Sequence, residues 1–377
     1  MSTAKSAPPA VSASAARSLK RDRITTVALV VFCQSFPALT FGGIALFLPL
    51  IRADLQMNFA QAGMLSAAST LTYALGQIPA GYLSDRFGPK RLFFIGILSS
   101  TVLSLNFGFI HGFELAVINQ LVAGVFRALM FAPGLSLMAS WFPPERRATA
   151  MGLYVLGGVS GNILLSLVGP ALTNNFGWRF TIIFFSVVGI GAALLYLTFG
   201  KEKPRVGPRP HVGMLDVFQL FRYKIMWICG AIQFIRLGVA ISFNFWLPSL
   251  LVADRGLSIQ QAGLVVAMGA AFTVMSNALG GYASDRLKNP PLVIGGSLAV
   301  IACTSTLLVL VDSIPVLLAV VAINSIFLQF YFGALFFVPV EVLGQRVAGM
   351  VTGFSNLFAN LGALTFAYLL GVVKDKA

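Results

Sequence analysis

The sequence predicts an all-α integral membrane protein built from two related halves, and three observations support this prediction. Hydrophobic residues make up 57% of the 377 positions and charged residues 10%, with a mean hydropathy of +0.87, whereas soluble domains usually carry about 25% charged residues. The hydrophobic residues form runs long enough to cross a bilayer as helices. Motifs of the first half recur about two hundred positions later, which is typical of secondary transporters with internal repeats.

Eleven apolar runs alternate with short polar connections, and each run is near or above the ~20 residues that a membrane-crossing helix needs. Six lie in the first half, at about 25–50, 61–83, 91–110, 114–140, 148–172 and 178–199. Five lie in the second half, at about 226–251, 260–283, 291–311, 314–340 and 348–372. We therefore expect an N-terminal six-helix bundle over 24–199, a cytoplasmic connection over 200–224 and a C-terminal five-helix bundle over 225–377. Residues 1–23 are expected to form a disordered cytoplasmic tail.

The basic residues indicate how the chain crosses the membrane. With the N-terminus in the cytoplasm, nineteen Lys and Arg lie on the inner side, and only Arg52, Arg179 and Arg255 lie outside. This asymmetry predicts a multi-pass protein of the inner (plasma) membrane with a cytoplasmic N-terminus. The net charge of +14 thus follows from topology, and we expect no nucleic-acid partner.

One six-residue stretch occurs twice, first as Gly81-Tyr-Leu-Ser-Asp85-Arg86 and then as Gly281-Tyr-Ala-Ser-Asp285-Arg286. Each copy lies where an apolar run ends and a short charged connection begins. Glycine permits a close approach of two helices, aspartate can interact with helix N-termini, and arginine stays in the headgroup region. The two copies therefore predict equivalent chain reversals at one membrane surface.

The first copy continues through Gly88 and Arg91, and residues 81–91 resemble the signature between the second and third helices of the major facilitator superfamily. The second copy resembles the weaker repeat of this signature between helices eight and nine. The resemblance covers the chain after residue 24 and implies two pseudo-symmetric six-helix bundles. That pattern has twelve helices, so the twelfth, which would begin near residue 377, is expected to be missing through truncation.

The same resemblance implies a set of charged residues that closes the inner side of the transporter. Glu145 and Arg147 in the fourth connection, with Glu341 and Arg346 in its repeat, join Asp85 and Asp285 in this set. In the family such residues form ion pairs at the inner gate. The alternative is a solvated cluster facing the headgroups, because exposed ion pairs contribute only ~0–1 kcal/mol.

Two arginines lie within the apolar runs, Arg127 near the middle of the fourth and Arg236 near the middle of the seventh. An arginine at the bilayer centre costs at least ~2.5–3.5 kcal/mol, and no Asp or Glu lies at a comparable depth. We interpret both as facing a water-filled cavity and binding an anion through forked hydrogen bonds. The alternative is that one caps backbone carbonyls or extends outward to the interface. Gln120 and Gln233 share helix faces with the two arginines and are expected to assist them.

These residues predict a secondary active transporter of a small anion, such as an organic carboxylate or a phosphate ester, working by anion exchange or proton symport. The alternatives are efflux of hydrophobic compounds by proton antiport and a truncated, non-transporting membrane protein. No nucleotide-binding loop, nucleophile elbow or zinc-ligand spacing is present. We therefore expect no enzyme activity, no cofactor and no metal, and a monomer whose partners are the lipid bilayer and the substrate.

Overall fold

The computed structural model describes residues 13–203, 214–249, 251–252 and 255–376, and the regular elements of these residues are all helices. The N-terminal half contains α1 (Ala13–Gln34), α2 (Phe36–Leu46), α3 (Leu48–Asp54), α4 (Phe59–Phe87), α5 (Pro89–Phe107), α6 (Phe113–Ser140) and α7 (Arg147–Phe199). The C-terminal half contains α9 (Lys224–Ser249), α10 (Ile259–Leu287), α11 (Pro290–Leu310), α12 (Ile314–Phe330), α13 (Phe332–Leu343) and α14 (Ala348–Lys376). Seven helical stretches of the described residues are both long and apolar enough to cross a bilayer. The predicted all-α membrane fold is confirmed.

Three segments differ in detail from the expected organisation. Residues 13–23, expected to be disordered, form the start of α1, because Ala, Leu, Lys and Arg are strong helix formers that extend the first span. The expected connection contains the short helix α8 (Met214–Leu220). α7 holds two consecutive spans, which meet at Gly177 with a φ of 83°. The remainder of the tail (1–12), part of the connection (204–213) and residue 377 lie outside the described residues.

The repeat also appears at helix starts. Asn58 and Ser258 each cap a helix by accepting a hydrogen bond from the main-chain N–H of a glutamine three residues later, Gln61 or Gln261, at 2.8 and 3.2 Å. Each glutamine side chain accepts a hydrogen bond from the capping residue's main-chain N–H at 3.0 Å. These capping boxes fix the starts of α4 and α10 at equivalent points of the two halves.

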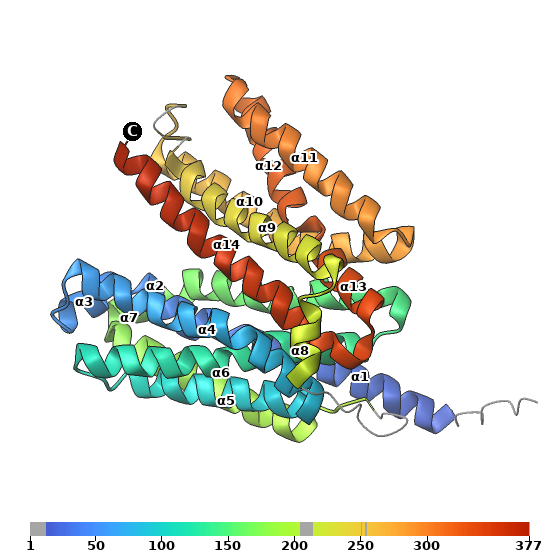
Figure 1. Ribbon diagram of the computed structural model, residues 1–377. Helices are drawn as coiled ribbons and strands as arrows, with labels where there is room; N and C mark the ends of the chain where they lie inside the picture. The colour runs from blue at the N-terminus through green and yellow to red at the C-terminus, as the bar shows by residue number, and fades with distance from the viewer. Residues whose placement is uncertain (1–12, 204–213, 250, 253–254, 377) are drawn as a thin grey trace, which may run out of the picture.

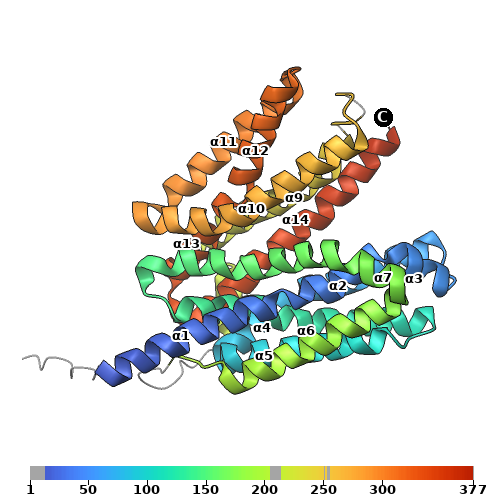
Figure 2. The same ribbon diagram turned by 180° about the vertical axis from the view of Figure 1, so that it is seen from behind.

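The two halves touch at one end and diverge toward the other (Figures 1 and 2). We call the end that carries Asp85 and Asp285 the inner end, which the basic residues predict to be cytoplasmic, and the opposite end, near α3, the outer end. Two helix pairs make most of the contact between the halves, α4 with α14 and α7 with α10, and we call these pairs the α4–α14 seam and the α7–α10 seam. α13 also packs against α7, and α14 against α6. The larger hydrophobic cluster extends across both halves, since Phe332 and Phe336 of α13 pack among residues of the N-terminal half.

Both seams depend on glycines. A Cβ added at Gly81 would lie 2.2 Å from the carbonyl oxygen of Gly349, and one added at Gly281 would lie 2.4 Å from that of Ala148. Any larger side chain would therefore separate the helices. The glycines of the repeated stretch thus permit the backbone contacts that close the inner end.

Candidate functional site

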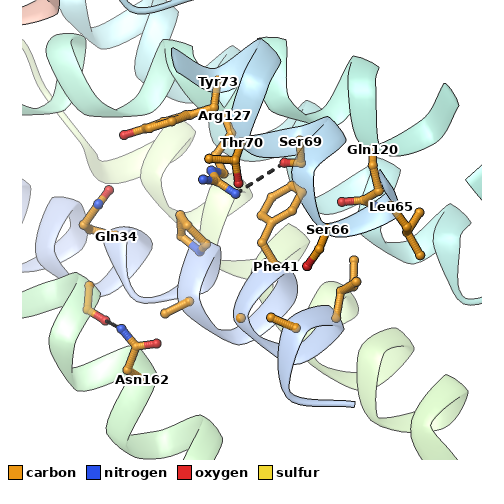
Figure 3. Close-up of a pocket in the computed structure, with 16 residues that line it drawn as sticks. Gln34, Phe41, Leu65, Ser66, Ser69, Thr70, Tyr73, Gln120, Arg127 and Asn162 are labelled. Carbon is orange, nitrogen blue, oxygen red and sulfur yellow. Dashed lines mark hydrogen bonds between the residues drawn. The ribbon is translucent and has the colours of Figure 1, made fainter. Parts of the chain in front are cut away.

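A cavity of ≈ 410 Å³ lies in the wall of the N-terminal half (Figure 3). Its lining comes from five helices of that half, and half of its sixteen residues are polar. The polar lining residues are Gln34, Ser66, Ser69, Thr70, Tyr73, Gln120, Arg127 and Asn162. Among the described residues that line it, none is Asp or Glu. A cavity with these walls offers hydrogen bonds to a polar solute and one full positive charge.

Arg127 supplies that charge and is held mainly by aromatic rings. Its guanidinium carbon lies 4.4 Å from the ring centre of Tyr73 and 4.8 Å from that of Phe41, as Figure 3 shows. Cation–π contacts of this kind compensate a desolvated charge by about 2 kcal/mol. Among the described residues its one hydrogen-bond partner is Ser69, whose hydroxyl accepts from Nη1 at a long 3.4 Å. Most of the five N–H donors of Arg127 are therefore free for a ligand.

The glutamines around this arginine are oriented by neighbours. Gln120, predicted to assist Arg127, does line the same cavity and donates to the side-chain oxygen of Asn119 at 3.2 Å. The hydroxyl of the buried Tyr154 lies 2.6 Å from Gln34 Oε1 and 2.9 Å from the main-chain oxygen of Met130, and its one hydrogen is shared between these two acceptors. Because the Gln34 oxygen is engaged there, its Nε2 amide group remains as a donor on the cavity wall.

Arg236 has different surroundings. It is 5% exposed, and it donates from Nε to Gln233 Oε1 at 2.8 Å and from Nη1 to Gln329 Oε1 at 2.6 Å. Its guanidinium carbon lies 5.1 Å from the ring centre of Phe332. The structure thus joins Arg236 directly to Gln233, as the shared helix face predicted. Arg236 is not among the residues that line the 410 Å³ cavity, so the two arginines differ in access as well as in partners.

The two halves are connected beside the cavity by an amide. Asn356 of α14 donates from Nδ2 to the hydroxyl oxygen of Tyr73 at 3.1 Å and to Gln77 Oε1 at 2.8 Å. On the inner side of Arg127, the rings of Phe131 and Phe336 also meet across the halves, with centroids 5.6 Å apart. The inner side of the site is therefore closed by both polar and aromatic contacts.

At the inner end, the two repeated aspartates bind helix N-termini of the opposite half. Asp85 accepts hydrogen bonds from the main-chain N–H groups of Gly349 and Met350 at 2.8 and 2.9 Å. Asp285 accepts from the N–H groups of Ala148 and Thr149 at 3.2 and 2.9 Å, and from the Thr149 hydroxyl at 2.6 Å. Each carboxylate thus satisfies the first N–H groups of a helix and complements its dipole. Burial raises the pKa of Asp285 above its ordinary value, although these hydrogen bonds and Arg146 oppose the rise.

The remaining predicted gate residues are distributed around this end. Arg86 and Arg286 donate to the hydroxyls of Tyr82 and Tyr282, one turn earlier on their own helices. Gly88 has a φ of 97° and ends α4, which requires the conformational freedom of glycine. Arg147 is half-buried, with the charges of Glu145 and Glu341 acting on it. The exposed members of the set are Arg86, Arg91, Glu145, Arg286, Glu341 and Arg346.

Sequence reasoning missed the side chains that hold the two arginines. Phe41 and Tyr73 are aromatic residues within apolar runs, where nothing in the local pattern separates them from lipid-facing or core positions. Ser69 is too common in membrane helices to indicate a ligand. Gln329 carried a usable signal, because an amide inside an apolar run requires a hydrogen-bond partner.

Comparisons with known proteins agree with this architecture. The family model described as Major Facilitator Superfamily matches residues 30–367. The chain is 22% identical to the hexuronate transporter of Bacillus subtilis, over 94% of this chain and 89% of that protein. It is 25% identical to the probable sulfoacetate transporter SauU of Cupriavidus necator, over 87% and 82% of the two chains. The structure resembles that of the Escherichia coli fucose:proton symporter FucP, with a TM-score of 0.75 and 15% identity over 94% of this chain and 93% of that one.

Proposed function

Because the chain belongs to the Major Facilitator Superfamily, we propose that it carries a small organic anion across the membrane by alternating access, with Arg127 as the principal anion-binding residue. The observation that carries this proposal is a guanidinium group in a polar cavity without an acidic partner among the described residues. An anion is the simplest compensation for that charge, and its oxygens would take the free N–H donors in pairs.

The chemistry of the cavity wall favours an organic acid that also carries polar groups. Hydroxyls and amides surround the charge, including those of Ser66, Thr70, Gln34 and Asn162. Two relatives are named for hexuronate and sulfoacetate, which are organic acids. These features support a carboxylate or sulfonate with further oxygens as the cargo class. We also propose anion exchange, or symport in which the substrate shares the proton, because the described lining residues include no carboxylate that could carry it.

Arg236 is proposed as a second anion-binding residue. Its two glutamine partners present neutral oxygens. A neutral partner yields to an anion more readily than a carboxylate does, because a carboxylate adds the attraction of a full opposite charge. We further propose that Asp85 and Asp285, with the charged residues around them, form an inner gate that opens when the halves rock. The protein is proposed to work as a monomer in the inner membrane, with its N-terminus in the cytoplasm.

Efflux of hydrophobic compounds by proton antiport receives no support from this cavity. The described lining residues include no Asp or Glu that could take up a proton, and their one charge, the guanidinium of Arg127, would repel a cationic compound. Susceptibility tests in a pump-deficient strain would separate the two functions, because an efflux pump would change drug tolerance.

The test is counterflow in proteoliposomes with labelled glucuronate, sulfoacetate, nitrate and a hexose phosphate. We expect saturable transport of at least one organic acid, and its loss in Arg127→Gln and Arg236→Gln. Arg222→Gln is the control, because that arginine is exposed in the connection between the halves. Unchanged transport in both site variants, with the chains folded, would refute the assignment.

A further inference from the structure

The amide bridge between α4 and α14 is adjacent to the candidate anion site but takes no part in holding Arg127. Asn356, 6% exposed, bonds both Tyr73 and Gln77. Gln77, fully buried, also donates to the main-chain oxygen of Tyr73 at 3.1 Å. Tyr73 stacks on Arg127 at 4.4 Å. A single side chain, Tyr73, therefore contacts both the charge in the cavity and the opposite half of the molecule.

The bridge belongs to the stripe of α4 that closes the inner end. Tyr73, Gln77, Gly81 and Asp85 follow one another at intervals of four residues and so lie along one face of the helix. Each member meets α14: the first two meet Asn356, Gly81 approaches Gly349, and Asp85 caps the start of α14. A displacement of Tyr73 therefore acts directly on the contact between α4 and α14, and this contact has to separate when the inner end opens.

The second seam lacks this bridge, although it repeats the other contacts. A Cβ added at Gly152 would lie 2.2 Å from the main-chain oxygen of Asn277. In the α4–α14 seam, a Cβ added at Gly353 would lie at the same distance from the main-chain oxygen of Gln77. In that register Val155 occupies the place of Asn356. Within the described part of α7 and α10, the side chain of Asn277 donates only to the main chain of its own helix, at Thr273, and its Oδ1 has no partner. The polar connection beside the cavity therefore exists on one seam alone.

We propose that Asn356 is a positioning residue through which an anion at Arg127 controls the α4–α14 seam, and that the α7–α10 seam follows without a sensor of its own. The inference rests on the function proposed above. The Tyr73 hydroxyl accepts a hydrogen bond from Asn356, so its own hydrogen is left to donate to an anion on the neighbouring guanidinium. Anion binding thus changes the geometry of the bridge, and this differential contact is what allows a ligand to shift a conformational equilibrium.

Two substitutions separate the bridge from the anion site. Tyr73→Phe keeps the ring on Arg127 and removes the hydroxyl, and Asn356→Leu removes the amide at nearly constant volume. Asn277→Leu is the matched control, because it removes a buried amide at the corresponding level of the other seam. In the absence of anion, Asn356→Leu, which loses two neutral hydrogen bonds, is expected to lower the ratio of inner-closed to inner-open molecules roughly tenfold, and Tyr73→Phe, which loses one, to lower it less.

The readout is the distance between spin labels at exposed outer positions, Leu50 of α3 and Leu310 of α11, in chains without native cysteines. Binding of glucuronate, sulfoacetate and nitrate is measured in parallel by calorimetry. We expect the wild type and Asn277→Leu to change their distance distribution on anion binding. Tyr73→Phe and Asn356→Leu should still bind the anion, with affinity reduced less than tenfold, while their distributions no longer respond and their maximal transport rate falls.

The outcomes distinguish this inference from the function on which it rests. If the wild type binds none of these anions, the proposed function fails and the inference fails with it. If the wild type binds and moves an anion, and both bridge variants respond as it does, the inference alone is refuted. A loss of response in Asn277→Leu equal to that in Asn356→Leu would also refute it, because the coupling would then not be specific to one seam.

Discussion

Replacing Gly81 with alanine is expected to force the inner end open. The added Cβ would lie 2.2 Å from the Gly349 carbonyl oxygen, 2.6 Å from its carbonyl carbon and 2.8 Å from the Met350 Cα. All three are main-chain atoms, so no side-chain rotation relieves the contact. Reaching even 3.0 Å from the oxygen requires about 0.8 Å of separation between α4 and α14. Overpacking of this kind costs about 1–3 kcal/mol, which lowers the ratio of inner-closed to inner-open molecules by about 5- to 150-fold.

The assay is the distance between spin labels on the inner ends of the two halves, compared with Gly63→Ala as the control. Gly63 lies on the same helix, but a Cβ there meets nothing within 4 Å, so that change should leave the distances unaltered. Gly281→Ala should behave like Gly81→Ala, because its Cβ would meet the Ala148 carbonyl oxygen at 2.4 Å. If Gly81→Ala retains the wild-type distance distribution, the close backbone contact does not hold the inner end closed, and the reasoning is wrong.

Three further predictions concern single side chains. Burial in the closed α7–α10 seam raises the pKa of Asp285, so the inner-closed state binds protons more tightly than the inner-open state. Acidification should therefore favour the inner-closed state, and this effect should be lost as the pH rises through the raised pKa. Asp285→Asn should flatten this dependence in the inner-end distances. Arg179→Gln removes hydrogen bonds to Asp54 and to two carbonyls of the turn between α5 and α6, so thermal unfolding should show a loss of about 1–3 kcal/mol. Tyr154→Phe frees the Gln34 oxygen, and calorimetry should show roughly threefold to tenfold weaker anion binding, whereas unchanged affinity would exclude a role for Gln34 as a donor.

The sequence predicted features that depend on local pattern. Apolar runs of about twenty residues indicated the helices, and a six-residue stretch that recurs two hundred positions later indicated two related halves, because both signals can be read directly from the order of residues. The expectation that Asp85 interacts with a helix N-terminus agrees with its contacts, but the helix involved, α14, begins more than 260 residues later. Such a partner is set by the packing of whole bundles, which no local pattern encodes.

The surroundings of the arginines were less predictable for a related reason. A helix in a membrane can be apolar on every face, so periodicity does not indicate which neighbour an aromatic residue will meet. Phe41 and Tyr73 approach Arg127 from two different helices, and Gln329 reaches Arg236 from a third. The depth of the arginines identified them as residues that need compensation, while the compensating groups depended on the assembled fold.

The distribution of repeated and unrepeated residues has a physical basis. The seams contain the repeated glycines and aspartates, which agrees with the proposed rocking of the two halves, because such a motion needs comparable contacts on both sides of its axis. The residues around the cavity are not repeated: at the repeat offset, Phe327 replaces Arg127 and Thr273 replaces Tyr73. Under the proposed function the cargo has no twofold symmetry of its own, and an arginine at position 327 would add a further buried charge, beside Arg127 and Arg236, for the same cargo to neutralise. The cost of an uncompensated arginine in the membrane thus favours a symmetric scaffold around an asymmetric site.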